Sequence, residues 1–192
     1  TAPNYAGVNT IDYVTIAQTG NAVDFGDMTN AKTSIASASS STRGVFGHGA
    51  ISPSPVGYMD FITMASTGNA TTFGNLSANN RNQIHGGGSS STRGIFAGGY
   101  ITNDIEFITI ATTGNSQDFG DMTVARFFGR GLSSPTRDVL AGNRITPGSS
   151  NSNVMDYIEI ATTGNALDFG DLAGDLGSQT GYGGQSNGHG GL

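Results

Sequence analysis

Short apolar stretches separated by polar turns run through the whole chain, and the same order of stretches occurs four times. Each copy contains a block of twenty residues: a β-branched and aromatic stretch, a Thr-Gly-Asn turn, and an Asp-Phe-Gly stretch or a close variant of it. The blocks occupy 10–29, 58–77, 104–123 and 154–173. A period of roughly 50 residues is typical of propellers and solenoids, in which one unit cannot bury its own apolar face. We therefore predict a single all-β repeat domain over 1–192.

The first stretch of each block predicts a strand that is covered on both faces. In 11–17, alternation places Ile11 and Tyr13 on one face and Val14 and Ile16 on the other. A strand with one solvent-exposed face would have a polar residue at every second position, whereas both faces of this strand are largely apolar. We expect the sheets to stack face to face. The Gly-Asn pair that follows predicts a hairpin turn, and the Asp-Phe-Gly stretch predicts the next strand.

A polar Ser/Thr turn followed by a short apolar stretch that stops at glycines is the second repeated element. It occurs at 39–49, 89–99 and 133–143. Weakly apolar segments precede it at 34–38, 82–86 and 127–131, and we interpret them as outer strands. Each copy then has four short strands and almost no helical periodicity. The predicted units are approximately 1–42, 43–92, 93–136 and 137–192.

Each copy has four strands, with a glycine pair after one strand and an aromatic residue in the next. An arginine such as Arg81 or Arg126 precedes the outer strand. This pattern resembles kelch-type β-propeller blades. The resemblance spans all four copies and implies a propeller of four four-stranded blades. Kelch blades usually have a tryptophan a few residues after the tyrosine. This chain has no tryptophan, and a phenylalanine follows twelve residues after the opening aromatic residue. The pairs are Tyr13/Phe25, Phe61/Phe73, Phe107/Phe119 and Tyr157/Phe169. Part of a larger propeller and a β-solenoid array are the alternatives.

The repeat also resembles segments of virion structural and fibre proteins of marine tailed phages, through the sequence TIATTGN followed by DFGDM at 109–122. This resemblance implies a non-enzymatic module of a tail fibre or other appendage, located in the virion or outside the cell. The implied partners are a host-surface glycan or protein receptor and other fibre subunits, including copies of itself. A secreted or surface carbohydrate-binding or carbohydrate-active propeller is one alternative. A purely structural fibre or capsid-decoration repeat is the other.

Composition mainly excludes classes of partner. Only 11% of residues are charged and the net charge is −6, so we expect no binding to nucleic acid. No apolar run reaches the ~18 residues that span a bilayer, so we expect no membrane insertion. There is no cysteine and hence no thiolate metal site. Because the chain begins at Thr1 without a signal peptide, we interpret it as a processed product or a piece of a longer protein.

The acidic residues recur at two positions of the repeat. Pairs occur as Asp24/Asp27, Asp118/Asp121 and Asp168/Asp171. Several carboxylates suit Ca²⁺, but Asp beside Gly is also common in turns, and we favour a hydrogen-bonded turn. The strand acids are Asp12, Asp60, Glu106 and Asp156. We expect them to accept hydrogen bonds from a neighbouring turn or from an arginine such as Arg43, Arg93 or Arg137.

The histidines do not form a recognisable metal-binding pattern. His48, His85 and His189 all lie in glycine-rich stretches, without the spacing of a ligand pair. No nucleophile elbow, phosphate-binding loop or zinc-protease signature is present. We predict no catalytic residue, no metal site and no cofactor.

The segments after the glycine stop differ between copies, at 48–59, 100–104 and 143–155. In a propeller these loops open on one face of the disc, where loop chemistry can vary over a fixed scaffold. We predict a binding surface there, with aromatic, amide and charged groups suited to sugars or a protein. Its residues are Tyr58, Tyr100, Asn103, Asp104, Arg144 and Asn153. Tolerated insertions without a ligand are the alternative interpretation.

Overall fold

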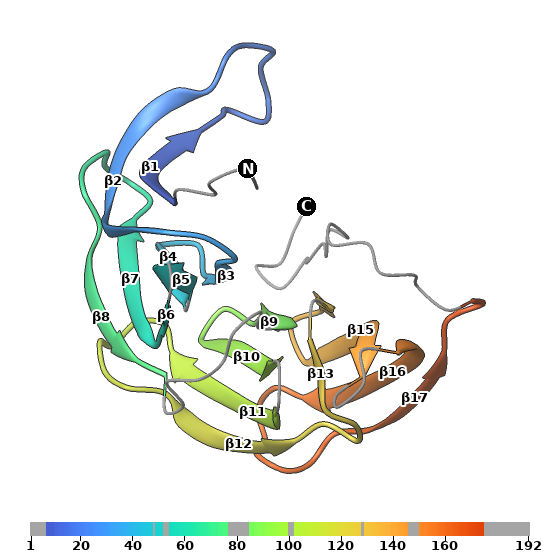
Figure 1. The fold of residues 1–192 in the computed structure, drawn as a ribbon. Helices are drawn as coiled ribbons and strands as arrows, with labels where there is room; N and C mark the ends of the chain where they lie inside the picture. The colour runs from blue at the N-terminus through green and yellow to red at the C-terminus, as the bar shows by residue number, and fades with distance from the viewer. Residues whose placement is uncertain are drawn as a thin grey trace.

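The chain folds into antiparallel β-sheets that follow one another along an open arc (Figure 1). The computed structural model describes residues 7–47, 49–51, 54–76, 85–99, 102–127, 129–145 and 150–174. Every regular element in these ranges is a β-strand. The all-β class predicted from the sequence is confirmed.

Four sheets correspond to the four copies of the repeat. Sheet 1 pairs β1 (Val8–Tyr13) with β2 (Val23–Lys32). Sheet 2 has the order β3 (Ala36–Ser39), β4 (Arg43–Gly47), β7 (Tyr58–Thr63), β8 (Thr71–Asn75). Sheet 3 contains β9 (His85–Ser89), β10 (Arg93–Gly99), β11 (Thr102–Thr109) and β12 (Gln117–Asp121) in that order. Sheet 4 runs β13 (Arg126–Phe127), β15 (Arg137–Ile145), β16 (Asn151–Glu159), β17 (Leu167–Asp171), and β14 (Arg130–Ser133) also pairs with β15. A separate hairpin joins β5 (Gly49–Ile51) to β6 (Ser54–Val56).

The predicted unit boundaries fall inside these sheets. The pairing of β3 with β4, of β9 with β10 and of β14 with β15 joins residues on both sides of positions 42, 92 and 136. Each large sheet therefore begins with the weakly apolar segment that precedes its Ser/Thr turn.

The described parts of these weakly apolar segments lie on the inside of the arc, in β3, β9 and β14, so the prediction that they are outer strands was wrong (Figure 1). Figure 1 shows β3 and β9 inside, whereas β8, β12 and β17 form the outer edge. The inner strands β3, β9 and β14 contact one another from sheet to sheet. Such convergence needs small residues: a Cβ on Gly88 would lie 2.4 Å from Cβ of Ser133, and a Cβ on Gly131 would lie 2.7 Å from the carbonyl carbon of Gly87.

Neighbouring sheets pack face to face through three apolar cores. Sheets 1 and 2 share Ile11, Phe25, Met28 and Ala70. Sheets 2 and 3 share a core that includes Val45, Met59, Phe73, Phe96 and Ile110. Sheets 3 and 4 share one that includes Ile105, Phe119, Leu140, Ile158 and Ile160. The predicted burial of both strand faces is confirmed in β11, where Ile105 to Ile108 are all buried. It is wrong for the first copy, where Val14 and Ile16 are exposed.

The two aromatic residues that recur twelve positions apart meet edge to face within each sheet. Ring centroids are 5.9 to 6.1 Å apart in all four copies, with interplanar angles from 73° to 88°. This is a favoured geometry for aromatic side chains. The phenylalanine of the pair is buried in the first three copies, at 8%, 3% and 2% exposure, so it fills the core between sheets.

The Asp-Phe-Gly-Asp stretches lie in outer strands, so the hydrogen-bonded turn favoured from the sequence was wrong. In sheet 3 the pairing shifts by one residue: Ile105 faces Gly120 and Glu106 faces Asp118. Phe119 is left without an opposite residue, which makes it a β-bulge. Gly120 takes a φ of 144°, a conformation that favours glycine.

Candidate functional site

The repeated motifs and the variable loops lie at opposite ends of the strands. β7, β11 and β16 each begin at a variable loop and end at a Thr-Gly-Asn turn. The Ser/Thr turns lie beside these turns, since the carbonyls of Thr42, Thr92 and Thr136 accept hydrogen bonds from the amides of Met64, Ile110 and Ile160 at 2.8 to 2.9 Å. We call this end the turn face. The opposite end, where β4, β10 and β15 finish and β7, β11 and β16 start, is the loop face.

On the turn face, the Thr-Gly-Asn turns of sheets 2, 3 and 4 each bind the outer strand of the preceding sheet. The amide of Gly68 donates to the Phe25 carbonyl at 2.7 Å, and the amide of Ala70 donates to the Asp27 carbonyl at 2.8 Å. In return, the Asp27 amide donates to Oδ1 of Asn69 at 3.0 Å. The same three bonds recur between sheets 2 and 3 and between sheets 3 and 4. The turn predicted as a simple hairpin connection is therefore also the contact between sheets.

The arginine after each Ser/Thr turn binds the next sheet. Arg43 donates from Nη1 to the carbonyls of Ile110 and Ala111 at 3.1 and 2.8 Å, and Arg93 donates to the Ile160 carbonyl at 2.8 Å. Each guanidinium also lies 4.4 to 4.5 Å from the centroid of its own sheet's aromatic ring. In sheet 4 the equivalent Arg137 instead pairs with Glu159 at 2.7 Å on the surface.

The strand acids bind the connection that leads into their own sheet. Asp60 pairs with Lys32 at 2.8 Å and accepts a hydrogen bond from Thr29 at 2.7 Å. Asp156 likewise pairs with Arg126 at 2.9 Å and accepts from Thr123 at 2.6 Å. All four charged side chains are fully buried. The sequence predicted hydrogen bonds to these acids from a neighbouring turn or an arginine. Asp156 does pair with an arginine, but it is Arg126, and Asp60 pairs with a lysine, so the named partners Arg43, Arg93 and Arg137 were wrong for these two acids.

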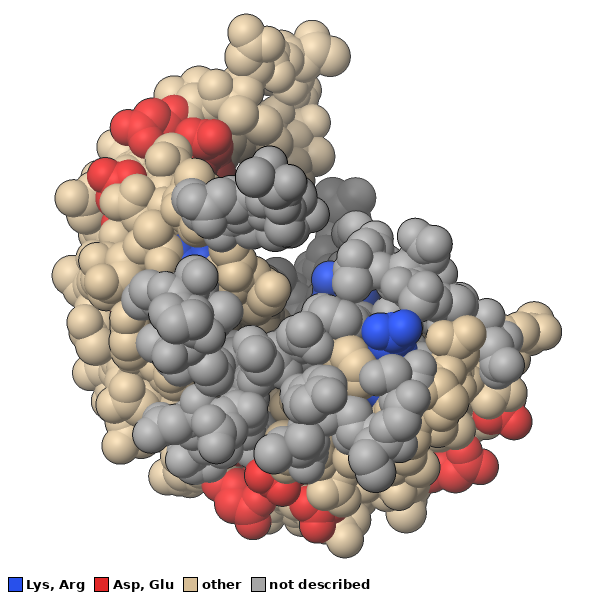
Figure 2. Space-filling view, viewed as in Figure 1, with Lys and Arg blue, Asp and Glu red and all other residues tan. Residues whose placement is uncertain are grey.

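The acidic pairs of the outer strands lie on the outside of the arc. Figure 2 shows Asp and Glu side chains along this outer edge. Asp24, Asp118 and Asp168 are exposed there. Within the described ranges, no three His, Asp or Glu side chains gather closely enough to hold a metal ion.

Of the predicted binding residues, Tyr58 lies at the loop face and covers a buried ion pair. Nζ of Lys32 is 4.7 Å from the centroid of the Tyr58 ring and donates to the Tyr58 carbonyl at 3.2 Å. Burial, and then the negative charge of Asp60, raise the pKa of the Tyr58 hydroxyl. Tyr58 as a whole is half-buried.

The other predicted residues occupy matching places in sheets 3 and 4. Asn103 and Asn153 accept hydrogen bonds at their carbonyls from Met122 and Leu172, at 2.8 and 2.7 Å. The Asn103 side chain also donates to the Met122 carbonyl at 3.1 Å. Asp104 and Arg144 are half-buried at the same end, and Nε of Arg144 has no hydrogen-bond partner among the described residues. Tyr100 lies outside the described residues. The structure thus brings five of the six residues to the loop face.

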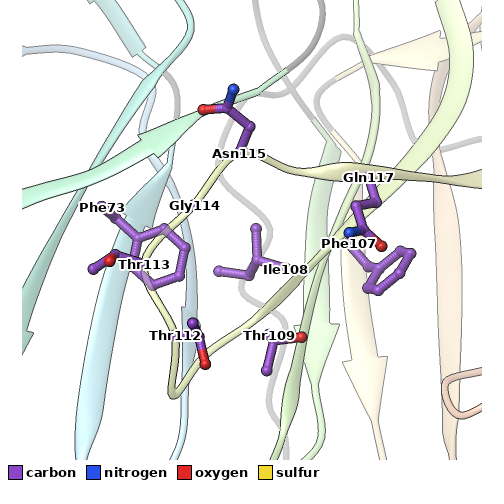
Figure 3. A pocket seen from close by; sticks show the side chains of 9 residues that line it. All are labelled: Phe73, Phe107, Ile108, Thr109, Thr112, Thr113, Gly114, Asn115 and Gln117. Carbon is purple, nitrogen blue, oxygen red and sulfur yellow. The ribbon is translucent and has the colours of Figure 1, made fainter.

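Three small cavities on the turn face were not predicted. One lies under each Thr-Gly-Asn turn of sheets 2, 3 and 4, with volumes of about 280, 240 and 350 Å³. Figure 3 shows the cavity of sheet 3, where Thr109, Thr112 and Gln117 surround Ile108, and Asn115 points away toward the neighbouring strand. The lining is neutral apart from Glu159 in sheet 4. The signal in the sequence was the polar pair before each Gly-Asn, which we read as turn chemistry alone.

Asp138 is a buried acid that sequence reasoning missed. It is fully buried between sheets 3 and 4, where the Gly88 amide donates to Oδ2 at 2.7 Å and Oδ1 has no hydrogen-bond partner among the described residues. Burial raises its pKa to about 6, against the opposing effect of backbone hydrogen bonds from Gly88 and Val139. The other two copies have Gly44 and Gly94 at this place in the Ser-Thr-Arg motif. That departure from the repeat was the available signal.

Comparison with known families and curated proteins assigns no function to the site. No model of a known protein family matches the chain, and no curated protein matches it significantly. In the described part of the chain, no helix is long and apolar enough to cross a membrane.

Proposed function

We propose that the chain is a non-enzymatic β-propeller module with kelch-like blades, part of a phage tail fibre or other virion appendage, and that its loop face binds a host-surface glycan or protein. The observation that supports this most is the separation of the two faces. Residues repeated between copies serve contacts between sheets, whereas the loops that vary share the opposite end of the strands.

Three features support the propeller arrangement. Successive sheets stack face to face with their first strands inside and their last strands outside (Figure 1). The inner strands converge on glycine and other small residues such as Ala38, whose Cβ would lie 2.5 Å from a Cβ placed on Gly94. The same three hydrogen bonds join each sheet to the next, so every step along the arc has the same geometry. A repeated rotation of this kind generates the disc of a propeller.

The chemistry of the loop face suits a polar ligand. Sheet 2 offers a half-buried tyrosine ring, sheet 3 offers an aspartate, and sheet 4 offers an arginine and an asparagine. Sugars and protein surfaces are bound by such mixtures of aromatic, amide and charged groups. Because these groups come from the variable loops of three sheets, one can change without altering the contacts on the turn face.

The test is binding of the purified, fluorescently labelled chain to a glycan array and to intact candidate host cells. We expect Arg144→Ala and Asp104→Ala each to lower binding about tenfold, which corresponds to about 1.4 kcal/mol. Thr113→Ala, on the exposed turn face, is the matched control and should bind as the unchanged chain does. Equal binding by all variants, or no binding to any glycan or cell, would contradict the proposal.

A purely structural fibre repeat is the second candidate, and one observation favours it. Tyr58 and Asn103, two of the residues assigned to binding, already make contacts inside the chain, with Lys32 and Met122. Under this alternative, Asn103→Ala lowers the melting temperature and no loop-face substitution changes adhesion. The array and cell measurements above therefore separate the two candidates.

A further inference from the structure

The repeating contact between sheets leaves two complementary halves without a partner in the described part of the chain. The outer strand β17 has the same sequence pattern as β2, β8 and β12 but receives no turn. The turn of the first copy, Thr19–Ala22, binds no outer strand. The exposure of the phenylalanine reports the difference: Phe169 in β17 is 49% exposed, compared with 2% for Phe119 in β12.

The strand β17 keeps the shape that receives a turn. Gly170 has a φ of 128°, close to the 144° of Gly26 and Gly120. At Gly26, Gly74 and Gly120 an added Cβ would lie 2.5, 2.1 and 2.4 Å from the backbone of a bound glycine, so these sites are filled. At Gly170 no described atom lies within 4 Å of that position. The receiving surface is thus formed, and no residue in the described part of the chain covers it at Gly170.

The first copy presents the matching half. Its turn sequence TGNA at 19–22 is identical to that at 67–70 and 163–166, both of which bind a strand. The apolar residues before it are uncovered: Ile16 is 97% exposed, whereas the equivalent Ile110 and Ile160 are 0% and 1% exposed. Val14 is 59% exposed, compared with 2% for Ile108.

We propose that the first-copy turn of a second copy of this chain docks on β17. Gly20 and Ala22 would donate from their amides to the carbonyls of Phe169 and Asp171, and the Asp171 amide would donate to Oδ1 of Asn21. These are the bonds that Gly164, Ala166 and Asn165 make to sheet 3.

Two observations favour a second copy as the occupant. Figure 1 places the chain's own turn, between β1 and β2, across the opening of the arc from β17. The segment Val14–Ala22 has no charged side chain, so the acidic β17 does not repel it. The contact is head to tail: each copy supplies one turn and one strand, which generates a closed ring or a longer assembly. This assembly goes beyond the proposed receptor binding and does not depend on it.

Sedimentation velocity over about 1 to 100 µM protein tests the proposal. Two variants each remove one half of the contact. Gly170→Ala places a Cβ where the turn must lie, and Ile16→Ser combined with Asn21→Ala removes the apolar and acceptor groups of the turn. Ile16 and Asn21 are exposed, so the turn variant should have the melting temperature of the unchanged chain. Gly170→Ala places alanine at a φ of 128° and should melt at a somewhat lower temperature, so circular dichroism first establishes that this variant is folded in the assay.

The expected result is association of the unchanged chain and at least a tenfold weaker association of either variant alone. An equimolar mixture of the two variants should give complexes of two chains only, since one intact turn and one intact strand remain. A monomeric unchanged chain, variants that associate as it does, or a mixture without the complex would overturn the proposal. No receptor enters the assay, so its failure is separate from failure of the proposed function.

Discussion

Replacement of Gly120 by alanine isolates the contact that joins one sheet to the next. The new Cβ would lie 2.4 Å from the carbonyl oxygen of Gly164, 2.5 Å from its carbon and 2.9 Å from the amide nitrogen of Asn165. All three are backbone atoms, so no side chain can rotate away to relieve the clash. Gly170 is the matched control: it has the same place in its strand and a similar positive φ, but no described atom within 4 Å.

The expected difference follows from what the two variants share. Both place alanine at positive φ, which costs roughly 1 to 3 kcal/mol and cancels in the comparison. Only Gly120→Ala displaces the turn of sheet 4 and breaks its three hydrogen bonds to sheet 3. At roughly 1 kcal/mol for each bond, Gly120→Ala should destabilise the chain by about 3 kcal/mol more than Gly170→Ala does.

Thermal unfolding followed by circular dichroism measures this difference. For a chain of this size, about 3 kcal/mol corresponds to a melting temperature roughly 6 to 12 °C lower for Gly120→Ala than for Gly170→Ala. The measurement is made at low protein concentration, where association through β17 does not contribute. Equal melting temperatures for the two variants would show that the turn-to-strand contact adds nothing to stability, and would refute the reasoning.

Two further predictions concern buried charges. Asp156→Ala leaves the Arg126 guanidinium buried without its carboxylate and should lower the free energy of unfolding by about 3 to 5 kcal/mol. Glu159→Ala removes only a surface partner of Arg137 and should lower it by under about 1 kcal/mol. Urea unfolding of both variants measures the difference. The pKa of Asp138 is raised to about 6 in the folded chain, so its proton stabilises the fold below about pH 4, and about 3 kcal/mol of stability is lost as the pH rises to about 6. Asp138→Asn should remove this step from the free energy of unfolding measured between pH 4 and pH 8. An unchanged step would assign the pH dependence to another group.

The parts of the fold that the sequence predicted well depend on local chemistry. Alternation of apolar residues over 105–111 indicates a strand buried on both faces, and a Gly-Asn pair indicates the end of that strand. The sequence shows aromatic residues such as Phe107 and Phe119 recurring twelve positions apart, and their ring contact in the structure follows because a hairpin with a fixed turn brings the same two positions together in each copy.

What the sequence did not predict depends on contacts between distant residues. Asp60 pairs with Lys32 and Asp156 pairs with Arg126 because the connection into each sheet folds back over that sheet's third strand. The spacing of residues in the sequence does not define this path. The weakly apolar segment 34–38 was placed on the outside for the same reason. Small residues suit both an exposed edge and a crowded centre, and only the packing of neighbouring sheets separates the two.

Contacts between sheets therefore explain why these residues are repeated, and few of the repeated residues remain to bind a ligand. The glycine of each outer strand admits the next turn, the asparagine of that turn closes the contact, and the arginine after the Ser/Thr turn extends to the following sheet. Substituting any of them disturbs a contact between two neighbouring sheets. Under the proposed function, selectivity for a receptor comes from residues that differ between copies, and half-buried polar residues of this kind, such as Asp104 and Arg144, lie at the loop face. For this reason, exchanging whole loops between copies should move binding specificity without lowering the melting temperature, and a large loss of stability on exchange would show that the loops themselves hold the sheets together.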